Sequence, residues 1–343
     1  MATVGRPGWF SHVSHLCRLM QFPFPGRKVL VTGGAGFIGS HVAEALLAEG
    51  CTVHVMDDLS GGVRENVPEG AVLHALDIRS PEAAALVERE RYAALCHLAA
   101  QMDVRRSVAD PAFDASVNVI GLLNLMEAGR EAGLERVAFS STGGAIYGEP
   151  DPAVNGGGPQ PESHPTLPLS PYGITKLVSE HYLRFYQRTH GVAYAALRFG
   201  NVYGPRQNPH GEAGVVAIFA QRMLRGEPVR VNGAGTQTRD YVYVGDVVRA
   251  FVAALASDVS GIFNVGTGVE TDVNTLFDTI NALTGAGRPR EYGPAAPGEQ
   301  MRSVLDTTLI RETLGWTPEV DVQTGLRETV AWFESRERAS PAA

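Results

Sequence analysis

A glycine-rich turn near the start of the chain limits the folds that this sequence can adopt. It lies between an apolar run that ends at Thr32 and a helical pattern that starts at Ile38, and its glycines are Gly33, Gly36 and Gly39. Such glycines allow a tight turn, let the backbone approach a phosphate and let a helix pack closely against a strand. The helix start adds free N–H groups and a positive dipole end. This order predicts a dinucleotide-binding unit.

An acidic residue follows at the end of the next predicted strand, residues 52–56. Asp57 lies 24 positions after Gly33. A carboxylate at this position accepts hydrogen bonds from the adenine-ribose hydroxyls and repels a 2′-phosphate. Because no arginine immediately follows Asp57, we expect the cofactor to be NAD and not NADP.

Strands and helices alternate along the chain as far as residue 199. Apolar runs predict strands at residues 27–32, 52–56, 72–76, 94–98, 136–140 and 192–199, and helical periodicity predicts helices at 38–49, from 81, from about 111 to 132, and after 171. Strands separated by helices of this length form parallel crossover units. We therefore expect an α/β fold, with a Rossmann-like doubly wound parallel sheet and a smaller C-terminal α/β substrate-binding lobe.

The predicted domain organisation has three parts. Residues 1–26 are expected to be an N-terminal extension, since they lack the long apolar core and small-residue cleavage site of a signal peptide. Residues 27–198 are the predicted NAD-binding Rossmann domain, and residues 199–343 are the predicted substrate lobe. The boundary is expected to be discontinuous, because about 240–266 includes a strand-like run that can return to the Rossmann domain. Residues 150–171 are rich in proline and glycine and are expected to form a loop.

Composition excludes several classes of protein. The chain has 343 residues, of which 44% are apolar and 19% charged, and its net charge is −8. A general basic surface for nucleic acid is therefore not expected. No apolar run approaches the ~20 residues that span a bilayer. Neither the three cysteines nor the ten histidines have metal-ligand spacing. We expect no metal, no membrane association and a cytoplasmic location.

A second motif indicates the chemistry. Tyr172 and Lys176 are four positions apart in a predicted helix, so their side chains share one face. A tyrosine ordinarily loses its proton near pH ~10, too high for a base at neutral pH. A neighbouring cation favours the phenolate and is expected to lower the pKa of Tyr172. A phenolate base beside a nicotinamide cofactor predicts oxidation and reduction at a carbon that bears a hydroxyl group.

Four further segments give the chain a family resemblance. They read HLAAQMDVRRSV at residues 97–108, SSTGGAIYG at 140–148, NVYGPRQ at 201–207 and TRDYV at 238–242. With the glycine turn and the Tyr/Lys pair, they resemble the UDP-glucose (UDP-galactose) 4-epimerases of the extended short-chain dehydrogenase/reductase superfamily, over about residues 28–332. The resemblance implies an oligomer, usually a dimer, with tightly held NAD and a UDP-sugar substrate bound by the second lobe.

The resemblance also implies roles for individual residues. The implied catalytic residues are Thr142, Tyr172 and Lys176. The implied cofactor-binding residues are Gly33, Gly36, Phe37, Ile38, Gly39, Asp57, Asp58, Leu59, Ser60, Gly62, Asp77, Ile78, Leu98, Ala99, Ala100, Gln101, Asn118, Ser140, Tyr172, Lys176 and Phe199. The implied substrate-binding residues are Thr142, Asn201, Val215, Val216, Asn232, Arg239 and Arg302. No metal ligand is implied.

The implied reaction inverts one sugar carbon without net oxidation. Tyr172 takes the proton of the C4 hydroxyl while C4 gives a hydride to NAD⁺, and Thr142 holds the reacting oxygen. Lys176 stabilises the phenolate. The 4-keto sugar then turns while its UDP stays anchored, and hydride returns to the opposite face.

The sequence departs from the family pattern at three substrate positions. Ala296 stands before a Pro-Gly-Glu turn where many relatives carry arginine, so either Arg302 supplies the diphosphate contact or the affinity is weaker. Asn232 stands where relatives often place an aromatic residue against uracil. The position that limits sugar size in the family falls on Ser303, and this small side chain leaves N-acetylated UDP-sugars open as substrates.

Other functions of the same fold fit this sequence less well. A nucleotide-sugar 4,6-dehydratase needs an extra acid and base, normally Asp-Glu after the hydroxyl residue, whereas Gly143 and Gly144 follow Thr142. Relatives that act on UDP-glucuronate carry arginine where Asn208 stands. A keto-sugar reductase usually prefers NADPH, which Asp57 disfavours. A non-catalytic dinucleotide sensor would need no combined threonine, tyrosine and lysine set.

Overall fold

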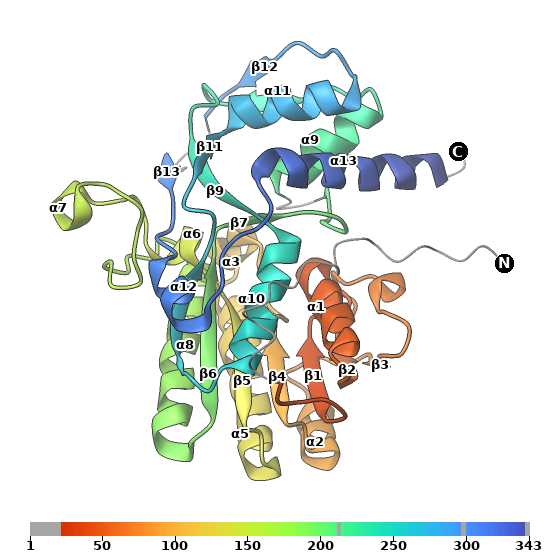
Figure 1. The fold of residues 1–343 in the computed structure, drawn as a ribbon, viewed down its shortest axis with the longest axis vertical. Helices are drawn as coiled ribbons and strands as arrows, with labels where there is room; N and C mark the ends of the chain where they lie inside the picture. Colours follow the sequence, from red (N-terminus) through yellow and green to blue (C-terminus); the bar gives the residue numbers. More distant parts are fainter. Residues whose placement is uncertain (1–21, 211–213, 296–299, 340–343) are drawn as a thin grey trace.

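The computed structural model describes residues 22–210, 214–295 and 300–339. Most of the predicted N-terminal extension (residues 1–21) and the Ala-Pro-Gly-Glu segment at 296–299 lie outside the described residues. The fold is α/β, with a mostly parallel sheet below a smaller lobe in Figure 1. This arrangement confirms the fold class that the alternating pattern predicts.

The main sheet has seven strands in the order β10-β6-β5-β4-β1-β2-β3, and neighbouring strands are parallel. Their bounds are β1 Lys28–Thr32, β2 Thr52–Met56, β3 Val72–His74, β4 Ala94–His97, β5 Arg136–Thr142, β6 Ala193–Phe199 and β10 Gly261–Val265. The strands are rich in apolar residues because helices cover both faces. The order reverses at β1 and β4, so their carboxyl ends form the crevice where such sheets bind ligands.

Helices pack on the two faces of this sheet as two layers. Helices α1 (Phe37–Ala48) and α10 (Val244–Ala256) lie side by side on one face (Figure 1). Helices α2 (Pro81–Glu90), α5 (Gly121–Ala132) and α8 (Pro171–His190) belong to the apolar cluster on the other face. None of the helices in the described part of the chain is long and apolar enough to cross a membrane.

Several elements differ from the sequence prediction. The helix predicted over about 111–132 is divided into α4 (Pro111–Ala115), a π-helical turn η4 (Ser116–Ile120) and α5. A π-turn adds a residue to the helical repeat and so rotates its neighbours. The predicted loop at 150–171 contains the short helix α7 (Pro152–Asn155), whose start is capped by Asp151. Three more short helices are η3 (Arg64–Asn66), α3 (Val104–Ala109) and α6 (Gly143–Ile146).

The smaller lobe is built on β9 (Thr238–Tyr243). It pairs with β7 (Asn201–Tyr203), β11 (Glu270–Asp272) and β13 (Arg302–Ser303). The remaining elements of this half are α9 Val215–Leu224, β8 Arg230–Asn232, α11 Val273–Thr284, β12 Glu291–Gly293, α12 Thr308–Leu314 and α13 Val322–Ala339. Between β9 and β11 the chain re-enters the main sheet, where β10 pairs with β6. The two parts of the fold are therefore joined by several crossings of the chain.

Candidate active site

The glycine turn between β1 and α1 leaves no space for side chains at two positions. Gly33 has φ +69°, and a Cβ there would lie 2.7 Å from the backbone nitrogen of Ala99. A Cβ at Gly39 would lie 2.2 Å from the carbonyl oxygen of Gly33. Helix α1 starts at Phe37 with no side-chain cap at Gly36, so its first turn can offer N–H groups to an anion.

Asp57 lies at the end of β2, next to this turn. Its buried carboxylate accepts hydrogen bonds from the backbone N–H groups of Ala35 (3.0 Å) and Leu59 (2.9 Å). Burial raises the pKa of Asp57, and these two backbone donors oppose the increase. In the following loop, Asp58 accepts hydrogen bonds from the backbone and hydroxyl of Ser60 at 2.9 and 2.6 Å. A Cβ at Gly62 would lie 2.6 Å from Asp57 Oδ1, so this loop closes over the carboxylate.

Residues 97–101 run along the other side of the glycine turn. The Thr32 hydroxyl accepts hydrogen bonds from the backbone N–H groups of Leu98 and Ala99, both at 3.2 Å. It also bonds His97 Nδ1 at 2.9 Å, and burial lowers the pKa of His97 to about 3, which keeps the imidazole neutral. Ala100 and Gln101 continue this segment. The glycine turn after β1 and the segment after β4 therefore lie next to each other at the carboxyl ends of these two strands.

Two of the predicted cofactor-binding residues, Asp77 and Ile78, follow β3. The carboxylate of Asp77 accepts hydrogen bonds from the backbone of Arg79 at 2.8 Å and from its guanidinium. Ile78 is buried against Gly121, where a Cβ would lie 2.5 Å from the isoleucine Cδ1. Their backbone lies beside the loop of Asp57, since the N–H of Leu76 donates to the Asp57 carbonyl at 3.2 Å.

Thr142 and Tyr172 lie at the starts of two neighbouring helices, α6 and α8. Thr142 ends β5 and caps α6, where its hydroxyl accepts a hydrogen bond from the N–H of Ala145 at 3.3 Å. Helix α8 starts next to α6, and a Cβ at Gly173 would lie 2.4 Å from the Ala145 carbonyl oxygen. Gly173 was not predicted as a site residue. A glycine inside a predicted helix is the signal that could have identified it, because close helix packing requires a residue without a side chain.

Lys176 lies in the second turn of α8 and is buried. Its Nζ donates a hydrogen bond to the carbonyl of Ser140 at 2.7 Å. The same atom lies 4.8 Å from the centroid of the Phe139 ring and 5.9 Å from the centroid of the Tyr172 ring. The ammonium and the phenol therefore share one side of α8, at the end of β5.

The structure corrects the expectation for the pKa of Tyr172. Burial, and then the negative charge of Asp114, raise this pKa instead of lowering it. Burial also lowers the pKa of Lys176 to about 8, although Asp114 and Glu180 act in the opposite direction. The ammonium is turned to the carbonyl of Ser140, so its attraction for a phenolate does not offset the desolvation of the phenol.

A buried polar network beside Tyr172 and Lys176 includes Asp114 and Thr175, two residues that were not predicted from the sequence. The carboxylate of Asp114 accepts hydrogen bonds from Gln101 Nε2 (2.9 Å), Asn118 Nδ2 (3.2 Å) and the hydroxyl of Thr175 (2.8 Å). Gln101 and Asn118, both predicted cofactor ligands, also bond each other through backbone and side chain. No local pattern marks Asp114, because two of its three donors, Gln101 and Thr175, come from other segments of the chain.

A second buried network joins the strands on the other side of Lys176. Glu180 accepts hydrogen bonds from the Ser141 hydroxyl (2.6 Å) and from the guanidinium of Arg198 (2.6 and 2.9 Å). Arg198 also donates to the hydroxyl of Tyr147 (2.8 Å), which donates to Asn264 Oδ1 at 2.8 Å. This chain of bonds ties β5, α8, β6 and β10 together behind Thr142.

The smaller lobe brings its predicted residues to the same end of the sheet. Phe199 ends β6 and pairs in register with Thr142. Asn201 follows, and its Oδ1 would lie 3.9 Å from a Cβ at Gly144. Arg239 in β9 lies opposite Ser303 in β13, and its Nη1 donates to the carbonyl of Thr238 at 2.8 Å.

Other predicted substrate residues lie farther along the lobe. The guanidinium of Arg302 donates to Glu270 (2.8 Å) and to the carbonyl of Gly157, so it joins the 150–171 segment to β11. Val215 and Val216 open α9, after its N-cap Gly214. Asn232 is exposed at the end of β8.

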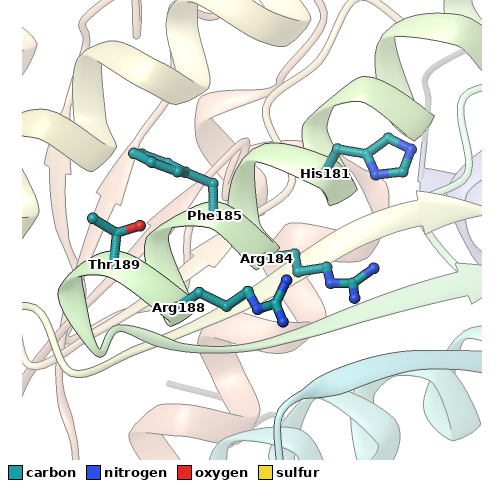
Figure 2. A pocket seen from close by; sticks show the side chains of 5 residues that line it. All are labelled: His181, Arg184, Phe185, Arg188 and Thr189. Carbon is teal, nitrogen blue, oxygen red and sulfur yellow. The ribbon is translucent and has the colours of Figure 1, made fainter.

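Two shallow hollows lie away from this site, on the outer surface of α8. One is lined by Val178, His181, Tyr182 and Phe185. The other, shown in Figure 2, is lined by His181, Arg184, Phe185, Arg188 and Thr189. Within the described ranges, no group of three or more histidine, cysteine, aspartate or glutamate residues could hold a metal ion.

Comparison with known proteins agrees with this geometry. Residues 29–266 match the model of the NAD dependent epimerase/dehydratase family. A UDP-glucose 4-epimerase of Mycolicibacterium smegmatis is 44% identical over 315 residues, which cover 90% of this chain and 99% of that protein. The crystal structure of a UDP-glucose 4-epimerase from Thermotoga maritima with UDP-glucose has a TM-score of 0.87 and 46% identity, covering 91% of this chain and 100% of that chain.

A second solved structure adds the cofactor. It is a UDP-glucose 4-epimerase from Thermus thermophilus in complex with NAD, with a TM-score of 0.82 and 47% identity over 89% of this chain and 98% of that chain. The family match covers more than half of the chain, and the relatives align over nearly all of it. This chain therefore belongs to the NAD dependent epimerase/dehydratase family.

Proposed function

We propose that this chain is an NAD-dependent UDP-hexose 4-epimerase that interconverts UDP-glucose and UDP-galactose through a 4-keto sugar. The observation that carries the proposal is the meeting of Tyr172, the buried Lys176 and Thr142 at the sheet edge that also bears the glycine turn. The high identity to UDP-glucose 4-epimerases supports the same reaction.

The residues of the glycine turn fit a dinucleotide. The space beside Gly33 and Gly39 admits no Cβ, and the start of α1 has no side-chain cap, as a backbone that binds pyrophosphate requires. Asp57 supplies a carboxylate for the adenine ribose, and Lys176 is the proposed donor to the nicotinamide ribose. Bound NAD would supply a hydride acceptor and return the same hydride.

The chain's own residues move the proton and hold the oxygen. Tyr172 accepts the proton of the C4 hydroxyl and later returns it, while the hydroxyl of Thr142 orients the reacting oxygen. Lys176 provides a positive charge that favours the phenolate. Gly143 and Gly144 offer no acid to expel water from the sugar, so we favour epimerisation over dehydration.

The substrate's UDP stays anchored in the smaller lobe while the sugar turns. Arg239 and Asn201 are the proposed contacts to the diphosphate, because a guanidinium binds phosphate oxygens in a fixed fork. Val215, Val216 and Asn232 are proposed to border the uracil. Arg302 is held by Glu270, so its role as a phosphate ligand stays a prediction. Ser303, small and opposite Arg239, favours UDP-N-acetylhexosamines as additional substrates.

We expect the purified protein to convert UDP-galactose into UDP-glucose without added cofactor. The measurement is NMR identification of products, with UDP-N-acetylglucosamine and UDP-glucuronate incubated in parallel. A 4-keto-6-deoxy product would assign a dehydratase instead. Protein that carries NAD, released on denaturation, but leaves every UDP-sugar unchanged would contradict the proposed function and favour a dinucleotide sensor.

The proposal includes a homodimer in the cytoplasm. The outer face of α8 presents an apolar stripe, which we define as Ile174, Val178, Tyr182 and Phe185, spaced to share one helix face. Phe185 is 48% exposed and lines both hollows described above, the second of which is shown in Figure 2. A second copy of the chain would cover this stripe. The free cysteines Cys51 and Cys96 are buried, as suits a reducing compartment.

Replacing Phe185 with glutamate is expected to convert the dimer into a monomer. Two negative charges would face each other across an apolar contact, and burying them without partners is unfavourable. Light scattering coupled to size-exclusion chromatography gives the mass. The control is Tyr292→Glu, an equally exposed aromatic residue on β12 in the other lobe. A Phe185→Glu protein that keeps the wild-type dimer mass would rule out this face.

A further inference from the structure

Asp114 is a buried carboxylate that the proposed reaction does not use. Its exposed fraction is 0%. Oδ1 accepts hydrogen bonds from Gln101 and Asn118, at 2.9 and 3.2 Å, and Oδ2 accepts one from the Thr175 hydroxyl at 2.8 Å. All three of these donors are neutral. Burying a charge in this way is costly, so a structural role alone would be served as well by a neutral side chain.

The donors hold Asp114 against the turn of α8 that carries the catalytic pair. Thr175 lies between Tyr172 and Lys176 in sequence, and its Oγ1 also lies 3.0 Å from the carbonyl oxygen of Tyr172. The π-turn η4 directs Asn118 to both Asp114 and Thr175, with Asn118 Nδ2 3.1 Å from the threonine hydroxyl. The carboxylate, the threonine and the first turns of α8 therefore form one rigid unit.

We propose that Asp114 is a positioning residue of this enzyme, whose buried negative charge lies beside the turn of α8 that carries Tyr172 and Lys176 and whose hydrogen bonds fix that turn. The inference rests on the proposed epimerase function, because it concerns the same proton transfer. It adds a residue to the site that touches neither substrate nor cofactor and acts through its neighbours.

The electrostatics agree with the geometry. The charge of Asp114 raises the pKa of both Tyr172 and Lys176. The elements packed around it carry further titratable groups, which have to be considered in any pH profile. On α8 and β4 these are Tyr172, Lys176, Glu180 and His97, and on or beside α3 and α4 they are Asp103, Arg105, Arg106 and Asp110. Glu180 also raises the pKa of Lys176, so Asp114 shares this effect with one other carboxylate.

The test removes the charge and keeps the shape. In Asp114→Asn, the amide oxygen can take the place of Oδ1 and accept from Gln101 and Asn118. The amide nitrogen can donate to Thr175, whose hydroxyl then turns to the carbonyl of Tyr172. Each of the three hydrogen bonds of Asp114 keeps a counterpart in this arrangement, and one N–H of the new amide has no acceptor, so the variant removes the charge with little change of shape.

Removing a negative charge lowers the pKa of an ammonium and of a phenol alike. We therefore expect both limbs of the pH profile of kcat for UDP-galactose to move to lower pH by about one pH unit, which reduces kcat about 10-fold at any pH well along the alkaline limb. Tyr172 and Lys176 titrate as a coupled pair, so neither limb of the profile belongs to one residue alone. Both limbs are expected to move to lower pH, because the pKa of each group falls. Tyrosinate absorbance gives a readout apart from activity. The contribution of Tyr172 is the difference in absorbance between a protein with Tyr172 and the same protein with Tyr172→Phe. In Asp114→Asn this difference should titrate at lower pH than in the wild type.

Two further variants make the test decisive. Asp110→Asn removes an exposed carboxylate from the same helix while keeping its N-cap to Phe113, and it should leave both limbs in place. Asp114→Ser is a second neutral variant, which should shift both limbs in the same direction even if Asp114→Asn does not fold. A loss of kcat with both limbs unmoved in the neutral variants would overturn the inference. An inactive wild-type protein would instead refute the proposed function.

Discussion

Tyr172→Phe is expected to lower kcat for UDP-galactose epimerisation about 10²–10⁴-fold, the usual worth of general acid–base catalysis. The substitution removes only the hydroxyl that accepts the C4 proton, so the ring keeps its place beside Lys176 and Gly173. Substrate binding should change little, because the proposed UDP contacts lie in the smaller lobe. The measurement is steady-state kinetics with UDP-galactose, together with the NAD content of the purified variant.

The matched control is Tyr182→Phe, which removes a phenolic hydroxyl from the exposed face of the same helix. It should retain wild-type kcat. If Tyr172→Phe keeps its NAD and loses less than about 10-fold in kcat, another group must be the base, and the proposed mechanism is wrong at its first step.

Gly39→Ala is expected to weaken NAD binding about 5–150-fold. The added Cβ would lie 2.2 Å from the Gly33 carbonyl oxygen and 2.9 Å from the Cα of Gly34, so α1 has to move away from the turn. Overpacking of this kind costs about 1–3 kcal/mol, which corresponds to that range in affinity. Displacing α1 also moves the N–H groups at its start. NAD released from the purified protein on denaturation, and calorimetric titration with NAD, report the effect.

Gly61→Ala is the control for this variant, since a Cβ at Gly61, in the neighbouring loop, meets no atom within 4 Å. It should retain wild-type NAD content. Equal loss of NAD in both variants would mean that the loop's flexibility matters, and that the close packing at Gly39 is not the cause.

The succession of strands and helices along the chain could be predicted because each signal is local. An apolar run such as residues 52–56, or the start of a helix at residue 81, can be recognised within one segment, and parallel crossovers follow from the alternation of strands and helices. The Tyr172–Lys176 pair was equally local, since one helical turn brings the two side chains together. For the same reason the glycine turn could be assigned to a dinucleotide before any coordinates.

The supporting residues of the site could not be predicted, because their partners are distant in sequence. Asp114 draws donors from Gln101 and Thr175, and Glu180 meets Arg198 only once α8 has packed on β6. The break in the helix over 111–132 includes Asn118, which bonds both Asp114 and Thr175. The pKa of Tyr172 was predicted in the wrong direction because desolvation depends on packing around the whole ring, which helical spacing does not reveal.

The position of β10 at the end of the main sheet has a consequence for how the chain is made. During synthesis β6 emerges before β10, and the whole segment from β7 to α10 must leave the ribosome before Gly261 can pair with Ala195. Until then β6 presents an apolar, unprotected edge, the kind of surface that recruits other nascent chains. A truncated protein that ends after β6 should therefore precipitate, and chaperone binding to nascent chains should peak before β10 is translated.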